Sequence, residues 1–206
     1  MLNRLLRISA VPALLATTLV VAACGSSSSS TTSSSTASVA ATSTTAAAPV
    51  GVVGKSTSVV LNPATAAALK QAEITVTPVA PATAKTALVF PVTGGHVVVT
   101  SLAGTIEHRG GLTFSHAGKS VTLTSFIVNT ETKQLTAMAG GQLVPVFDLN
   151  LASIKRASGP SGTVLASNIG LNLTEQAASA LNSGLGVSTF KAGLNFGIAT
   201  LTVAVG

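Results

Sequence analysis

The sequence predicts a mainly β protein with one antiparallel domain, sandwich-like or barrel-like, and two short helices. Short runs rich in Val and Thr recur between Gly, Pro and Asn residues, a spacing typical of all-β sandwiches and barrels. Residues 49–206 suit one such domain, long enough to bury roughly two-thirds of its unfolded surface. The predicted strands are STSVVL (56–61), ITVTPV (74–79), TALVF (86–90), HVVVTS (96–101), GTIEH (104–108), LTFSH (112–116), SVTLTSFIVN (120–129), QLTAM (134–138), LVPVFDLNL (143–151) and GIATLTVAV (197–205).

Two alanine-rich segments, 61–72 and 171–184, interrupt the strands and predict the helices. In the first, Asn62 is a suitable N-cap and Pro63 suits the first turn. In the second, Thr174 or Asn172 can cap the helix and Gly184 can end it. Both segments begin with Leu-Asn, which fits either an internal repeat or the same local solution used twice. We favour the second, a short helix that covers a sheet edge, because repeat folds need at least three units.

The N-terminus predicts export to the cell envelope. Residues 1–23 have the basic start, apolar run and small residues of a secretory signal peptide. The last of these residues and Cys24 form the stretch VAAC, which resembles the lipobox of bacterial lipoproteins. The resemblance implies a diacylated (palmitate-bearing) Cys24 that anchors the mature chain on the extracytoplasmic face of the cell membrane. Two acyl chains are enough for stable anchoring.

Residues 24–48 are rich in Ser, Thr and Ala, and predict a flexible tether between the anchor and the domain. Because Cys24 is the only cysteine, disulfides within one chain and CxxC metal or redox centres are excluded. The net charge is +6, but the basic residues are scattered and the chain has no Trp or Tyr. This pattern argues against nucleic-acid binding. Separately, we expect the protein to be a monomer.

Two of the three histidines lie in TIEHRGGLTFSHAGK (105–119) and raise the question of a metal site. If Gly110 and Gly111 form a hairpin turn, the register that pairs apolar with apolar residues is a three-residue loop with His108 opposite Leu112. In that register His108 and His116 are roughly 13 Å apart along the strands. A zinc ion, about 2 Å from each ligand nitrogen, cannot bridge that distance, so we expect no shared metal.

An enzyme is not expected, because the five carboxylates are scattered along the chain. Asp148 alternates with apolar residues in VFDLNL, and we interpret it as a residue on the solvated face of a strand. A hydrolase would need a Ser, a His and a carboxylate that converge in space. A cleft that joins His96 or His108 to Asp148 would favour that alternative.

The stretches LAGTIEHRGGLTFSHAGKSVTLTSFIVNTETKQLTA, FDLNLAS and LTEQAASALN, within residues 102–182, resemble the domain of actinobacterial HtaA-type haem-transport proteins. The resemblance implies a β-rich fold and haem held by a tyrosine that a histidine supports. This chain has no tyrosine, so haem would need His96, His108 or Met138 as its axial ligand.

The sequence therefore predicts a non-catalytic, lipid-anchored envelope protein with a binding or structural β-domain and no resident cofactor. The first alternative is a carrier of haem or of a small apolar molecule, and the second is a hydrolase with an unrecognised site. The ligand-binding candidates are His96, His108 and Asp148.

Overall fold

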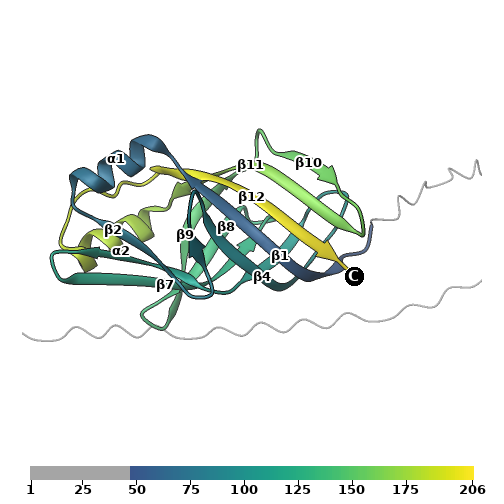
Figure 1. The fold of residues 1–206 in the computed structure, drawn as a ribbon, viewed down its shortest axis with the longest axis horizontal. Helices are drawn as coiled ribbons and strands as arrows, with labels where there is room; N and C mark the ends of the chain where they lie inside the picture. The colour runs from purple at the N-terminus through teal and green to yellow at the C-terminus, as the bar shows by residue number, and fades with distance from the viewer. Residues whose placement is uncertain (1–46) are drawn as a thin grey trace, which may run out of the picture. The chain divides into compact units, whose positions relative to one another are not determined.

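The computed structural model describes residues 47–206, so the predicted signal peptide, Cys24 and nearly all of the predicted tether lie outside the described residues. The prediction of a mainly β fold is confirmed. The described part holds twelve strands and two helices (Figure 1). They are β1 (Val50–Leu61), α1 (Pro63–Gln71), β2 (Thr75–Val79), β3 (Thr83–Ala84), β4 (Leu88–Val97), β5 (Gly104–His108), β6 (Gly111–His116), β7 (Lys119–Asn129), β8 (Gln134–Ala139), β9 (Gln142–Asn150), β10 (Lys155–Ser158), β11 (Thr163–Leu173), α2 (Glu175–Leu185) and β12 (Asn195–Val205).

Eight of the strands form a closed antiparallel barrel in the order β1-β4-β5-β7-β8-β9-β11-β12, with β12 paired again to β1. Closure leaves no free edge in this ring. The other four strands extend from it: β6 pairs with β7, β2 with β6, β3 with β4, and β10 with β11. Alternate residues of each barrel strand point inward and form one apolar core. This core and the eight barrel strands lie within residues 50–205, so the described residues 47–206 hold the complete ring of strands together with its core.

Three barrel strands carry a bulge at a non-glycine residue with positive φ. Lys55 (φ 97°), Ser125 (φ 54°) and Asn168 (φ 63°) each lie where the pairing of β1, β7 or β11 shifts register. Such bulges bend a strand and increase its twist, which is what a small closed barrel requires.

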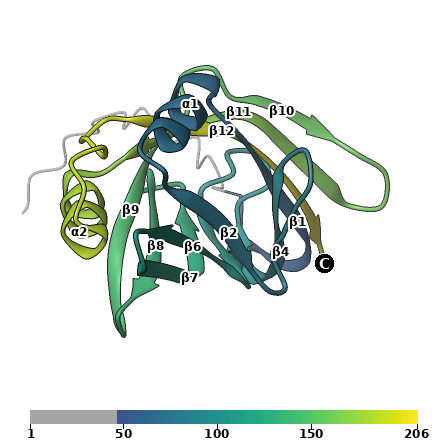
Figure 2. The same ribbon diagram turned by 60° about the vertical axis from the view of Figure 1, so that its left-hand side comes forward.

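The two helices leave the barrel at the same end (Figures 1 and 2). They follow β1 and β11, the two strands that flank β12 and run antiparallel to it. Asn62 and Thr174 are the N-caps, accepting hydrogen bonds from Ala64 N (2.9 Å) and Ala177 N (3.1 Å). No helix among the described residues has the length and hydropathy needed to cross a membrane.

One prediction about α2 needs correction. The helix ends at Gly186, which takes the left-handed conformation (φ 71°) that favours glycine, and not at Gly184. The helix packs over β6, β7 and β9, where β9 pairs with β11 only at residues 147–150 and β7 pairs with β8 only at residues 123–129. Its buried residues are Ala177, Ala178, Leu181 and Leu185.

The predicted hairpin at Gly110–Gly111 is wrong. Strands β5 and β6 do not pair with each other; both pair with β7, β5 against residues 127–129 and β6 against residues 119–124. They are therefore two halves of one bent strand. Gly110 lies at the bend with φ 89°, where a Cβ would meet Val79 O at 2.8 Å and the backbone of Ala82 at 2.6 Å. The true hairpin turn is Ala117–Gly118, which joins β6 to β7 with both φ angles positive.

Candidate functional site

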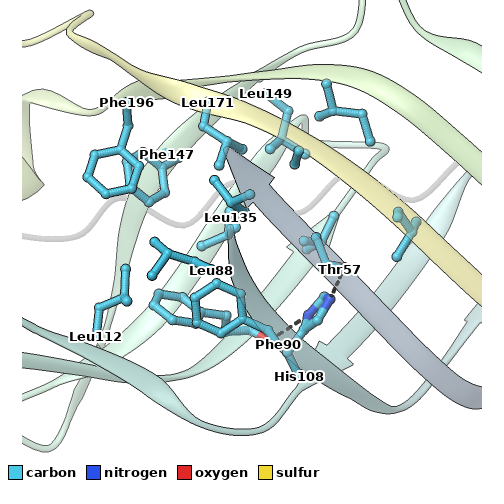
Figure 3. Close-up of a pocket in the computed structure, with 16 residues that line it drawn as sticks. Thr57, Leu88, Phe90, His108, Leu112, Leu135, Phe147, Leu149, Leu171 and Phe196 are labelled. Carbon is cyan, nitrogen blue, oxygen red and sulfur yellow. Dashed lines mark hydrogen bonds between the residues drawn. The ribbon is translucent and has the colours of Figure 1, made fainter. Parts of the chain in front are cut away.

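The interior of the barrel encloses an apolar cavity of about 50 Å³ (Figure 3). All eight barrel strands contribute to its wall, and β6 adds one residue. With the exception of Thr57 and His108, its lining is hydrophobic. The lining residues are Thr57, Val59, Leu88, Phe90, His108, Leu112, Phe126, Val128, Leu135, Phe147, Leu149, Ile169, Leu171, Phe196, Ala199 and Leu201.

His108 is the polar centre of this wall, and its hydrogen bonds fix its tautomer. Nδ1 lies 3.2 Å from the carbonyl oxygen of Phe126, an atom that only accepts, so Nδ1 carries the proton. Nε2 then accepts the hydrogen bond from the Thr57 hydroxyl, at 2.6 Å. The Thr57 hydroxyl and His108 Nδ1 are therefore both engaged in hydrogen bonds, and neither donor is left for a ligand.

The charge state of His108 follows from its burial. Its side chain is 5% exposed, and this loss of solvation lowers its pKa from 6.5 to about 4. The backbone carbonyls of Phe126 and Ile106 oppose the shift but do not cancel it. At neutral pH the imidazole is uncharged, as an apolar interior requires.

Aromatic rings in edge-to-face and tilted contact close the cavity on the side of the helices. Phe147 and Phe196, which line the cavity, have ring centroids 5.0 Å apart. Phe114 packs on Phe196 (6.2 Å) and Phe190 packs on Phe114 (5.8 Å). Asn182 of α2 holds the backbone of Phe190 through two hydrogen bonds, 2.8 Å and 3.0 Å long. This end of the barrel is therefore filled with side chains and tied to the helix.

A second cavity, of about 110 Å³, lies toward the opposite end. It shares four apolar wall residues, Val128, Leu149, Ile169 and Leu201, with the inner cavity. The connections β4–β5 (98–103) and β9–β10 (151–154) and the start of the β7–β8 connection (130–133) surround it, together with Arg156 of β10. We call this second space the mouth cavity.

The β4–β5 connection covers the mouth cavity. Leu102 is only 3% exposed and takes a positive φ of 60°, which is unusual for leucine. Thr130 Oγ1 donates to the Leu102 carbonyl (2.5 Å) and accepts from Gly104 N (3.0 Å). The Arg156 guanidinium donates to the Thr100 carbonyl (3.2 Å). These bonds hold the connection across the end of the barrel.

The structure does not bring the three predicted ligand-binding residues together. His108 lies inside the barrel, whereas His96 and Asp148 are exposed on the outer faces of β4 and β9. Neither exposed residue lines either interior cavity. His116 lies beyond the bend on β6, so it cannot share an ion with His108. Within residues 47–206 no group of three or more metal-ligating side chains is found.

Haem does not fit the interior. Drug-sized ligands occupy pockets of about 300–1,000 Å³, and the inner cavity holds about 50 Å³. His108 is the one histidine in the lining of this cavity, and its Nε2 already accepts the Thr57 hydroxyl. His96 and Met138 lie outside both cavities.

Sequence reasoning missed Thr57, Leu102 and Arg156. Thr57 is 51 residues from His108 in the chain, and only the closure of the barrel brings them together. The one signal for Thr57 is its place among inward-facing apolar residues of β1. Leu102 and Arg156 lie in connections and at an outer strand, where periodicity carries no information.

The fold of this barrel was compared with the folds of known proteins. The chain is similar to the solved C-terminal domain of HtaA from Corynebacterium glutamicum, with a TM-score of 0.56 and 14% sequence identity. The match covers 76% of this chain and 99% of that domain. This is an HtaA-like fold. No family model and no curated protein matches the chain. At 14% identity, the HtaA likeness concerns the fold alone.

Proposed function

We propose that this chain is a non-catalytic, lipid-anchored protein of the cell envelope whose barrel binds a small apolar ligand in its interior. The observation that carries the proposal is the apolar cavity enclosed by all eight barrel strands. The signal-like residues 1–23 and the lipobox-like stretch that ends at Cys24 support the anchor and the extracytoplasmic location.

The chemistry of the wall supports an apolar ligand over a polar one. The Thr57 hydroxyl donates to His108 Nε2, and His108 Nδ1 donates to the Phe126 carbonyl, so neither residue has a donor free for a ligand. A polar ligand would lose its hydration without gaining partners, which is costly. Cavities lined by apolar side chains stay dry and take up apolar molecules.

The size of the cavity limits the ligand. About 50 Å³ is several times the 10–15 Å³ that one water requires and well below the roughly 150 Å³ of a cavity that takes benzene. The closed interior therefore suits a small apolar group or the end of a hydrocarbon chain.

The test is a titration of residues 47–206 with 1-octanol, followed by methyl NMR. We expect saturable shifts at Ile169, Leu171 and Leu201, which line the cavity, and none at the exposed Val53 and Leu143. The matched variant Ala199→Leu, which fills the cavity, should abolish the shifts. Equal shifts at outer and inner methyl groups, or none, would contradict the proposal.

Haem is tested in parallel by a haemin titration read in the Soret band. We expect no saturable shift. A saturable shift that is lost in His96→Ala or His108→Ala would instead favour the haem carrier and overturn the apolar-ligand proposal.

A further inference from the structure

We propose that the ligand enters through the mouth cavity and is an amphiphile, with a hydrocarbon chain inside the barrel and an anionic head group held by Arg156. This inference rests on the proposed function, because it assumes that the interior binds an apolar group. It adds the route by which the ligand enters and the chemical class of the ligand. It also assigns the β4–β5 connection (98–103) as the lid over the mouth cavity.

The route follows from what closes each end of the barrel. At the helix end, the rings of Phe147, Phe196 and Phe114 pack in edge-to-face and tilted contacts beneath Phe190, which α2 holds in place. Opening that end would disrupt the largest aromatic cluster of the core. At the other end, three connections surround the mouth cavity, and the one that covers it, β4–β5, contributes the buried side chain of Leu102.

The two cavities share an apolar wall. Val128, Leu149, Ile169 and Leu201 face both spaces, so only side chains separate the mouth cavity from the inner one. A hydrocarbon chain that enters at Leu102 meets apolar groups along its whole path to Phe147.

The positive charge of Arg156 at the mouth cavity indicates that the head group of the ligand is anionic. Arg156 is the only charged residue that lines the mouth cavity, and the lining contains no carboxylate. Its guanidinium is exposed and donates to the neutral Thr100 carbonyl, a weaker acceptor than an anion. Guanidinium groups match carboxylate and phosphate oxygens with paired hydrogen bonds.

The hydrogen bond from Arg156 to the Thr100 carbonyl links recognition of the head group to opening of the mouth cavity. While Arg156 donates to Thr100, it holds the β4–β5 connection over the mouth cavity. An anionic head group competes for these donors, so its arrival releases the connection and lets Leu102 move aside. A neutral head group would find only the hydroxyls of Ser101 and Thr130.

The experiment compares octanoate, octyl phosphate and 1-octanol, three probes with one chain length, on residues 47–206. By calorimetry we expect both anions to bind about tenfold more tightly than the alcohol, which is the scale of one hydrogen bond between charged groups. Arg156→Gln should remove this preference and leave 1-octanol unchanged. Lys155→Gln, which changes an exposed cation outside the lining, should keep the preference. The two anions compared with each other distinguish a carboxylate from a phosphate head group.

The outcomes separate the two proposals. If none of the probes shifts the cavity methyl groups, the proposed function fails. If 1-octanol binds inside but the anions bind no better, or Arg156→Gln has no effect on their preference, this inference fails and the proposed function stands.

The lid is tested by the rate of binding. Leu102→Ala should raise the association rate of octanoate, and Thr130→Val, which removes the hydrogen bonds that hold the lid, should do the same. Leu143→Ala on the outer face is the control. Unchanged association rates in both lid variants would overturn the route.

Discussion

His108 ties the stability of the barrel to pH. Its pKa is about 4 in the folded protein and 6.5 without burial. Between these values the unfolded chain binds a proton that the folded protein excludes, so stability falls as the pH drops from 6.5 to 4. A shift of this size corresponds to about 3 kcal/mol of unfolding free energy. Urea unfolding of residues 47–206 at several pH values measures this loss.

The control is the double variant Thr57→Val with His108→Leu, which removes the titrating group together with its partner. Between pH 6.5 and 4, the unfolding free energy of this double variant should change less with pH than that of the wild type. If wild type and variant lose stability in parallel over this range, another group is responsible and the neutral state of His108 is not the cause.

At the level of single residues, the sequence identified His108 but not its environment. Spacing alone placed it opposite Leu112 on a hairpin, whereas its neighbours are Thr57 and Phe126, on β1 and β7. These partners depend on how the strands close into a ring. A local pattern contains no information on that closure.

At the level of elements, local chemistry predicted the helices and misjudged two strands. Asn62 and Thr174 were predicted as caps because a cap needs only neighbouring residues. Strand β11 was missed because the bulge at Asn168 breaks the alternation between Ala166 and Ile169. The adjacent glycines 110 and 111 resemble a turn, although they serve a bend.

The cap of α2 stabilises the closed end of the barrel. Thr174 Oγ1 accepts from Ala177 N and donates to the Pro145 carbonyl on β9 at 2.8 Å, joining the helix to the wall. Thr174→Ala should lower the unfolding free energy by about 1–2 kcal/mol, through the lost cap and the unpaired carbonyl. Thr174→Ser retains the hydroxyl and should retain most of the stability in thermal unfolding. Equal losses in both variants would mean that the methyl group, and not the cap, is important.

At the level of the whole molecule, the barrel and the proposed anchor are separate in sequence. Among the described residues, 47–206, the twelve strands and the apolar core lie within residues 50–205, and the lipobox-like stretch ends at Cys24. Lipid attachment and ligand binding should therefore be separable by mutation.

Cys24→Ser tests this separation in the full chain. Two acyl chains hold a protein on a membrane stably, and serine cannot carry the thioether-linked diacylglycerol. We expect loss of labelling by an alkyne-palmitate analogue and release from the membrane fraction, with the octanol-induced methyl shifts of the purified full-chain variant unchanged. The matched control is Ser26→Ala, two residues away, which should keep both label and membrane association. A Cys24→Ser variant that stays labelled and membrane-bound would show that another residue anchors the protein.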